Sequence, residues 1–437
     1  MTVIGKNFPL TREARKAQLK TIVKDNQVIG TVKVPGHGRV NVYKIPLEYL
    51  SYNPYNTRFL AQAKTLEKRL GRTLSDENAE DIFEIENFLW KLKEDKNANT
   101  IDSLIKEGQL QPGVVTNDGI VLSGNRRFRL LNEISRNHSK YKDHSLEGLQ
   151  FFEAAILTEK LTDKEIRAYE SFYQYGNEDK VEYDPIQKYI AAYEQSELGF
   201  ELQDIANHFL SITAGDVKVV KKWLKVFELM TEYLEYIGED GIYTALTNRE
   251  EAFLNLYETE KSLRTGKKGK SIWAFDELDL VDLKQRYFDY IRLGKATHDF
   301  RYLIKVFSEK KRWDAFNKNV NGTVAATETK TLDDYRQEHT ELNESEISTI
   351  RQNDYVAAVG KTLDKLFGEE KAYIVNKEQE VTPIKALDSI LDKFSSLKTQ
   401  LDSRTNVDTF VSGEFTTKFE TAKKAVFDLE KTLKRLK

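Results

Sequence analysis

The sequence predicts an α+β protein, in which a small α/β domain near the N-terminus is followed by mainly α-helical domains. Two short β-branched runs, Val114-Val115 and Ile120–Leu122, are joined through Asn117-Asp118-Gly119, which is typical of a β-hairpin. Further strand patterns lie at 28–34, 40–45 and 150–157. After the last of these the apolar residues recur at helical spacing, and two heptad patterns follow near the C-terminus.

Composition limits the classes of protein that the chain can belong to. Its 437 residues suffice for two or three domains, and it contains 40% hydrophobic and 31% charged residues. The net charge is −3, so any surface that binds nucleic acid has to be local. The absence of cysteine excludes disulfides and cysteine-ligated metals. No apolar run reaches membrane-spanning length and residues 1–30 lack a signal-peptide core, so we expect a cytoplasmic protein without a membrane partner.

We expect the chain to divide into six segments. They are an N-terminal extension (1–40), an α/β domain (41–160) with a helical insertion (60–98), a helical region with a helix-turn-helix (161–235), a helical domain (236–315), a linker region (316–380) and a helical hairpin or coiled coil (381–437). Within the extension, Lys20–Val23 has a strand-like pattern. Within the insertion, we expect Ser75-Asp76-Glu77 to cap a helix.

The turn after the second hairpin strand is the strongest candidate for a binding site. Ser123-Gly124-Asn125 leads into a helix with apolar positions at helical spacing, and this helix carries Arg126, Arg127 and Arg129. A helix N-terminus offers unpaired N–H groups, glycine permits close approach of a ligand, and arginine suits phosphate. The pattern therefore predicts a site for a nucleotide phosphate or a nucleic-acid backbone. The alternative is a surface turn with solvated arginines.

These motifs resemble the N-terminal domain of ParB-like proteins, a family that includes the chromosome- and plasmid-partition factors. The resemblance rests on Leu110-Gln111-Pro112, the following valines, and Val121–Arg129. It implies that Gln111 and Pro112 lie against the base of CTP or another NTP, and that the segment with Gly124, Asn125, Arg126, Arg127 and Arg129 holds the phosphates. Tyr49–Arg58 resembles the family's Asn-Pro…Arg box, which implies that Arg58 lies near the nucleotide. Sulfiredoxin shares this fold, but its chemistry needs a cysteine, which this chain lacks.

The helix expected at 162–174 carries Glu170 at the position of the family's glutamate. The resemblance implies that Glu170 is a catalytic residue and a ligand of Mg²⁺ bound with the nucleotide. The chain departs from the family pattern at Ser171, where asparagine is expected, and at Lys180, which stands in place of an arginine. A CTPase-like NTPase activity is therefore left open.

A helix-turn-helix pattern follows at 200–230, in the order expected from the ParB-like resemblance, which covers about half of the chain, residues 41–235. Val217, Val220, Leu224 and Phe227 form the expected packing stripe of its second helix. Opposite this stripe stand four lysines at i, i+3, i+4 and i+7: Lys218, Lys221, Lys222 and Lys225. A continuous basic face on a recognition helix suits double-stranded DNA. The alternative is a solvated lysine face.

The last segment carries two apolar stripes with alternating spacings of three and four residues. They consist of Leu387, Ile390, Phe394, Leu397 and Leu401, and of Phe415, Phe419, Ala422, Val426, Leu429, Leu433 and Leu436. This spacing is typical of a coiled-coil seam. We expect an antiparallel hairpin that associates with itself or with a second copy, which would give a homodimer.

Together these patterns favour a nucleotide-regulated DNA-binding protein of the ParB-like class. Two alternatives stay open: a ParB-like nuclease or NTPase of a mobile-element or defence system, and a protein-interaction module whose nucleotide site is vestigial. NTP turnover that depends on Glu170 would favour the enzyme. DNA binding that does not respond to nucleotide would favour the interaction module.

Overall fold

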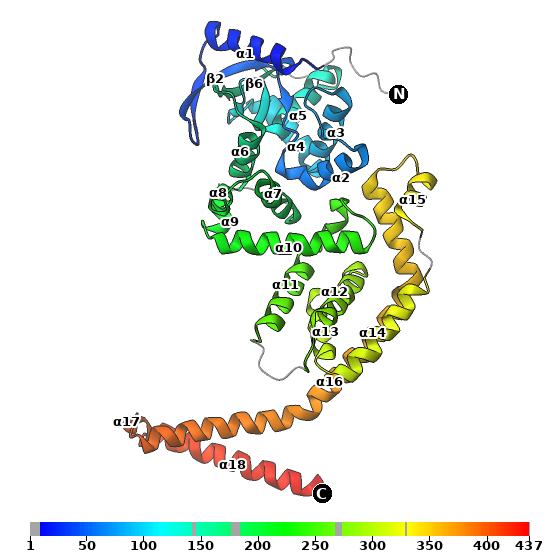
Figure 1. The fold of residues 1–437 in the computed structure, drawn as a ribbon. Coiled ribbons are helices and arrows are strands. Elements are labelled where there is room, and N and C mark those ends of the chain that lie inside the picture. The colour runs from blue at the N-terminus through cyan, green and yellow to red at the C-terminus, as the bar shows by residue number, and fades with distance from the viewer. Residues whose placement is uncertain (1–8, 142–145, 176–183, 267–272, 328–329, 437) are drawn as a thin grey trace. The chain divides into compact units, whose positions relative to one another are not determined.

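The computed structural model describes residues 9–141, 146–175, 184–266, 273–327 and 330–436 (Figure 1). The chain divides into two units, Met1–Leu363 and Asp364–Lys437. A small mixed sheet lies at the N-terminal end of the first unit and helices follow it, which confirms the predicted α+β class. No helix among the described residues combines the length and the apolar character needed to cross a membrane.

The sheet contains six strands in the order β1-β2-β6-β4-β5-β3. Their bounds are β1 (Gly30–Val34), β2 (Gly38–Pro46), β3 (Ser51–Tyr52), β4 (Gly113–Val115), β5 (Ile120–Ser123) and β6 (Phe151–Ile156). Strand β4 runs parallel to β6 and β3 runs parallel to β5, whereas the other neighbours are antiparallel. The strands predicted at 28–34, 40–45, 114–115, 120–122 and 150–157 are therefore confirmed. Because β1 pairs with β2 and lies at the end of the strand order, the segment expected as an N-terminal extension supplies one edge of the sheet.

Helices cover both faces of this sheet. They are α1 (Arg12–Asp25), α2 (Leu60–Leu70), α3 (Ala79–Lys91), α4 (Glu94–Glu107), α5 (Asn125–Arg136) and α6 (Asp163–Tyr175), with short 3₁₀ turns η1 (Leu47–Tyr49), η2 (Thr57–Phe59) and η3 (His138–Tyr141). Side chains of α1, α3, α4 and α5 form the larger core with one sheet face. Ile166 of α6 packs in a smaller core on the other face, with Val114 and Ile120. Successive strand residues alternate between the two cores, as the pleat requires.

Two local predictions near the N-terminus are wrong. Lys20–Val23 lies inside helix α1, because Leu19 and Ile22 recur at helical spacing and are buried against the sheet. The Thr11 hydroxyl caps this helix by accepting a hydrogen bond from the Ala14 N–H. Helix α3 is capped by Asn78 and not by the Ser75–Glu77 segment, since the Asn78 side chain accepts from two first-turn N–H groups.

The rest of the first unit is helical. Its elements are α7 (Ile186–Glu197), α8 (Leu202–His208), α9 (Leu210–Thr213), α10 (Val217–Tyr236), η4 (Tyr243–Leu246), α11 (Glu250–Thr265), α12 (Glu277–Arg292), η5 (Thr297–Asp299), α13 (Phe300–Phe307), α14 (Lys310–Ala325), α15 (Leu332–Glu338) and the beginning of α16 (Glu344–Asp402). Aromatic side chains of the helical domain expected at 236–315 are buried, among them Tyr287, Phe300, Phe307 and Trp313. The linker region expected at 316–380 is largely helical, since it contains the end of α14, α15 and part of α16.

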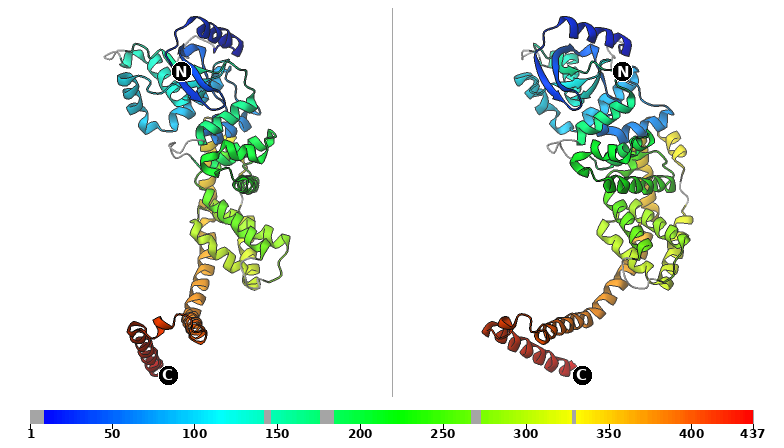
Figure 2. Two further views of the ribbon diagram at one scale, coloured as in Figure 1. Left: turned by 90° about the vertical axis from the view of Figure 1, so that its left-hand side faces the viewer. Right: turned by 60° about the vertical axis from the view of Figure 1, so that its left-hand side comes forward.

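The second unit consists of the remainder of α16, α17 (Val407–Phe410) and α18 (Gly413–Leu436). Within this unit, α17 connects the end of α16 to α18, so that the chain reverses its direction (Figure 2). The two helices predicted from the heptad stripes are thus confirmed. No side chain between residues 381 and 435, all of which the structure describes, is buried.

Candidate functional site

The predicted strand–glycine–helix turn is present. Strand β5 ends at Ser123, Gly124 adopts the left-handed conformation with φ of 99°, and α5 begins at Asn125. A Cβ atom at position 124 would lie 2.9 Å from the Phe152 ring, so glycine is required here for space as well as for conformation. No side chain caps α5. Its first-turn N–H groups have no intrahelical acceptor, which gives this end partial positive charge.

The three arginines of α5 do not gather around this turn. Arg126 donates to the side chain of Asn97 on α4 over 2.9 Å. Arg127 donates to the carbonyl oxygen of Gln111, and burial lowers the pKa of its guanidinium. Arg129 points to α3, where its guanidinium stacks 5.0 Å from the Trp90 ring centre. Of the three, only Arg127 lies beside the Gln111-Pro112 segment that the resemblance places at the base.

Three other predicted residues do come together, around the loop that begins at Asn53. The Asn53 N–H donates to the side chain of Asn125 over 3.2 Å, which joins this loop to the first residue of α5. Arg58 donates through Nε to the Gln174 side chain on α6 over 2.8 Å. Glu170, also on α6, accepts from Asn53 Nδ2 at 2.9 Å. Arg58, Asn125 and Glu170 therefore belong to one polar network, although they lie far apart in the sequence.

The environment of Glu170 does not fit the metal ligand that the resemblance implies. Its carboxylate is buried, and its oxygens accept from Asn53 Nδ2 and, at 3.3 Å, from the Thr57 N–H. A Mg²⁺ ion would have to displace these donors and to find further oxygen ligands. The described residues contain no group of three or more His, Cys, Asp or Glu side chains that could hold a metal. Lys180, the other residue of this motif, lies outside the described residues.

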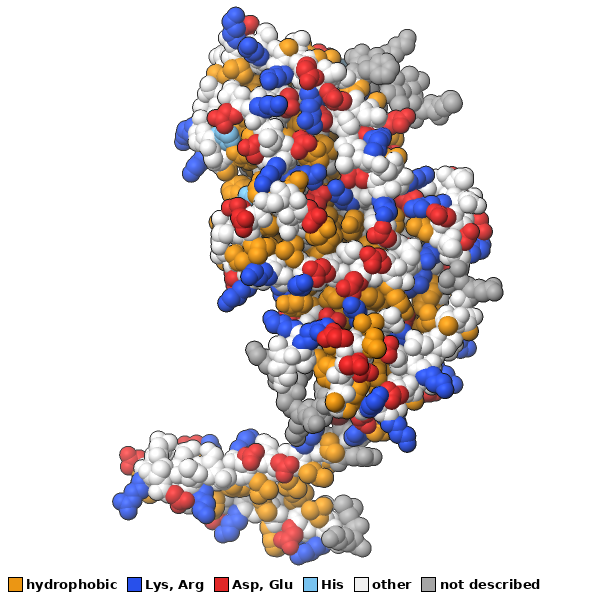
Figure 3. All heavy atoms as spheres, viewed as in Figure 1, with side chains coloured by type: hydrophobic (Ala, Val, Ile, Leu, Met, Phe, Trp, Pro, Cys, Tyr) orange, Lys and Arg blue, Asp and Glu red, His pale blue; other side chains and the backbone are white. Residues whose placement is uncertain are grey.

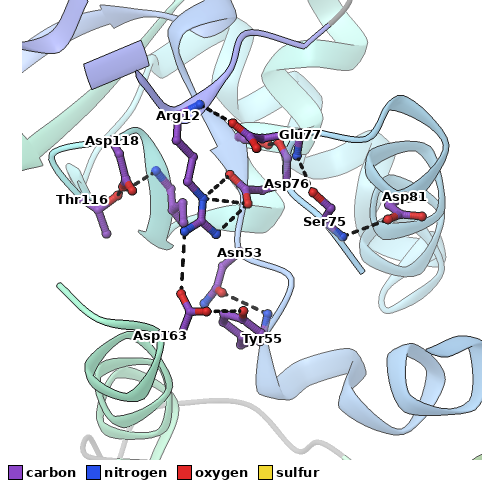
Figure 4. Close-up of polar contacts among 12 residues, drawn as sticks. Arg12, Asn53, Tyr55, Ser75, Asp76, Glu77, Asp81, Thr116, Asp118 and Asp163 are labelled. Carbon is purple, nitrogen blue, oxygen red and sulfur yellow. Dashed lines mark hydrogen bonds and ion pairs between the residues drawn. The ribbon is translucent and has the colours of Figure 1, made fainter. Parts of the chain in front are cut away.

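A buried ion cluster beside this loop is not apparent from the sequence (Figure 4). Arg15 is almost completely buried, and it donates to the Asp76 carboxylate and, over 2.8 Å, to the Asp118 carbonyl oxygen. Arg12 also contacts Asp76, at 2.7 Å, and lies 3.7 Å from Asp163 of α6. Burial alone would lower the pKa of Arg12, but the hydrogen bond and the charge of Asp76 raise it. We call Arg12, Arg15 and Asp76 the α1 clamp, because they fix α1 to the loop between α2 and α3, while Arg15 also joins α1 to the hairpin turn.

The one sequence signal for this clamp is the position of Arg15. It lies on the same side of α1 as Leu19, where an apolar residue would be expected, and therefore has to find a buried acid. The sequence does not show which acid this is, because Asp76 comes from the loop between α2 and α3, 61 residues further on.

The predicted lysine face is present on α10, but half of it is paired. The four residues are Lys218, Lys221, Lys222 and Lys225. Lys222 forms an ion pair of 2.8 Å with Glu258 of α11, and Lys225 forms one of 2.8 Å with Glu228. Lys218 and Lys221 are exposed and form no ion pair with any residue that the structure describes.

The segment predicted as a helix-turn-helix differs from the prediction in two details. The connecting segment contains the short helix α9, and the packing stripe of α10 is shifted. Val220 and Phe227 are buried as expected, but Trp223 takes the place expected for Leu224, which is only half-buried. Trp223 packs edge-on against Phe209, a contact that needs the turn to bring the two helices together.

No protein-family model, no curated protein and no solved structure matches this chain.

Proposed function

We propose that the chain is a DNA-binding protein whose binding is controlled by a nucleotide held at the Gly124 turn. The observation that supports it best is the uncapped N-terminus of α5, which follows directly from the glycine turn and contacts the Asn53–Arg58 loop. Such a terminus favours a phosphate through its free N–H groups and its dipole. The ParB-like resemblance supports the same ligand class, CTP or another NTP.

Two arginines are suited to assist the α5 N-terminus. Arg127 lies next to Gln111, where the base is proposed to bind, and burial lowers the pKa of its guanidinium. Arg58 extends from the loop that contacts Asn125, with Gln174 orienting its Nε. A phosphate would offer a charged acceptor to the Arg127 guanidinium, which donates to a neutral carbonyl oxygen. We propose neither a Mg²⁺ ion nor nucleotide hydrolysis at this site, because the Glu170 carboxylate already accepts hydrogen bonds from Asn53 and Thr57.

Isothermal titration calorimetry with CTP, ATP and GTP tests the nucleotide site. Arg127→Ala should weaken binding by about 10- to 100-fold, the effect of one charge-assisted hydrogen bond. The matched control is Arg129→Ala, which removes a cation from the same helix but from the side that faces Trp90, and it should bind as the wild type does. Failure of the wild type to bind any of the three nucleotides, with Mg²⁺ present, would reject the site.

The DNA partner is assigned to α10, because its exposed Lys218 and Lys221 lie near the start of the second helix of the helix-turn-helix. Control by nucleotide is measured as duplex affinity with and without the nucleotide that binds. An affinity that is the same in both conditions would separate DNA binding from the turn and favour the interaction-module alternative.

We further propose that the second unit pairs with a second copy of the chain. Its apolar stripes are uncovered: Leu401 is 51% and Phe419 is 47% exposed, and Leu387 and Val426 are similar. A continuous exposed apolar strip usually marks a contact surface. A second copy of the chain carries a strip with the same heptad spacing, so the two strips can pack against each other. By contrast, the exposed large apolar residues of the first unit are scattered over separate elements.

Light scattering on the full chain tests this pairing. The wild type should be a dimer, and Phe419→Glu with Phe427→Glu should give a monomer, because both side chains are exposed within one chain and matter only if a partner covers them. Leu110→Glu, at a still more exposed apolar site in the first unit, is the control and should leave the dimer intact. A monomeric wild type would reject the pairing.

A further inference from the structure

Positive charge is concentrated near the N-terminus, in a chain that is acidic as a whole. The net charge of the protein is −3. Residues 9–46, which contain α1, β1 and β2, hold eight lysines and arginines but only two acids, Glu13 and Asp25, so this segment alone carries a charge of +6. Its cations are Arg12, Arg15, Lys16, Lys20, Lys24, Lys33, Arg39 and Lys44. Such segregation produces a local positive potential.

Helix α1 directs its lysines away from the sheet. Leu19 and Ile22 are buried in the larger core. Lys16, Lys20 and Lys24 are exposed and recur every four residues, so they form one stripe, with neighbouring lysines about 6 Å apart along the helix axis. None of the three forms an ion pair with a residue that the structure describes.

The β1–β2 hairpin adds two cations on the same side of the sheet. Lys33 and Arg39 are direct cross-strand partners, and both are exposed. Because side chains alternate along a strand, Arg39 shares its face with Tyr43, which packs in the same core as Leu19 of α1. Figures 1 and 2 show α1 and the hairpin side by side, and Figure 3 shows lysine and arginine side chains over this part of the domain.

The pairing of Lys33 with Arg39 carries a cost. Like charges directly opposite each other destabilise a sheet, and neither side chain forms an ion pair with a described residue that would offset this. Arg39 donates to the Thr31 hydroxyl over 3.3 Å, which leaves its charge uncompensated. An external anion that lies across both strands would remove the repulsion.

We propose that Lys16, Lys20, Lys24, Lys33 and Arg39, the N-terminal basic face, bind the phosphate backbone of duplex DNA. Five unpaired cations on one side of the domain would neutralise phosphates and release their counterions. This inference rests on the proposed function in one respect, that the partner is DNA. Binding at the N-terminal basic face requires neither the nucleotide turn nor the lysines of α10. A membrane surface fits less well, because the apolar side of α1 is buried in the domain core and is unavailable for insertion into a bilayer.

The test is the salt dependence of binding to a fluorescent random-sequence DNA duplex, measured by anisotropy on the full chain. Replacing Lys16, Lys20 and Lys24 with alanine should flatten the log–log salt slope by about two to three units. The control variant replaces Lys91, Lys96 and Lys106, three exposed lysines of helices α3 and α4, and makes the same change in net charge. It should leave the slope within about one unit of the wild type.

Three outcomes would overturn the proposal. An unchanged slope in the α1 variant would mean that its lysines are only solvated. An equal loss in both variants would mean that net charge alone governs binding. Loss of binding to phosphatidylserine vesicles, without any loss on DNA, would assign the face to a membrane surface. A separate Lys218→Ala and Lys221→Ala variant reports on α10, so failure of the basic face and failure of the proposed function can be told apart.

Discussion

The N-terminal basic face and the lysine face of α10 look alike in the sequence but differ in the structure. Each includes a row of lysines on the side of a helix that faces away from the core, and the N-terminal basic face adds Lys33 and Arg39 from the β1–β2 hairpin. The five cations of the basic face form no ion pair with described residues, whereas Lys222 and Lys225 of α10 are neutralised by Glu258 and Glu228. Counting charges on a helix therefore overestimates the positive potential of α10 relative to that of α1.

The difference arises from what surrounds each helix. Glu258 lies on α11, which packs beside α10 and is separated from Lys222 by 36 positions in the chain. Among the residues that the structure describes, no acid pairs with Lys16, Lys20 or Lys24 on the outer side of α1, which is held from beneath by the clamp and by its apolar side chains. Whether a cation is free for a ligand depends on this tertiary arrangement.

The largest expected effect comes from breaking the α1 clamp. Asp76→Ala would leave Arg15 as a buried cation without its partner, so the free energy of unfolding should fall by about 3–5 kcal/mol. The same variant should lose the contribution of α1 to the DNA salt slope, while the contribution of α10 persists. Urea unfolding and anisotropy measure the two effects.

The matched control is Asp240→Ala. Asp240 pairs with Lys68 at a site where both side chains are about half exposed, so its loss should cost less than about 1 kcal/mol. If both variants lose the same stability, the clamp is no more important than a surface ion pair, and α1 is held by its apolar contacts alone.

The sequence was sufficient for features that depend on neighbouring residues. The hairpin at Asn117-Asp118-Gly119, the Gly124 turn and the α5 helix were all predictable, because turn residues and helical spacing are local signals. The directions of Arg126 and Arg129 were not, because they depend on helices α3 and α4 that pack against α5. Adjacent residues on a helix point in different directions, so an arginine run need not converge on one ligand.

Polar contacts between residues far apart in the chain were the part of the site that the sequence predicted least well. The ParB-like resemblance implied that Glu170 binds a metal, but nothing in the sequence showed that its carboxylate would accept hydrogen bonds from Asn53 and Thr57, more than a hundred residues away. In the same way, Lys20–Val23 resembled a strand because its apolar pair is adjacent, whereas the decisive signal was the spacing of Leu19 and Ile22.

A smaller effect is expected when the unpaired lysines of α10 are compared with its paired lysines. Lys218→Ala with Lys221→Ala removes two unpaired cations and should flatten the DNA salt slope by about two units. Lys222→Ala with Lys225→Ala removes the same charge, but these lysines already neutralise acids and release fewer counterions from DNA. We expect this second variant to change the slope by less than about one unit.

Removing the acidic partners of Lys222 and Lys225 is the control for the difference between the two lysine pairs. Glu258→Gln with Glu228→Gln leaves Lys222 and Lys225 in place but removes their partners. Because both lysines then become available for phosphate, the slope should steepen by about one to two units, and the Lys222→Ala and Lys225→Ala changes should acquire the larger effect in this background. Equal effects of the two lysine pairs in the original chain would show that ion pairing within the protein does not limit DNA binding. No effect of either pair would show that the α10 lysines are a solvated face, and the N-terminal basic face would then be the principal DNA contact.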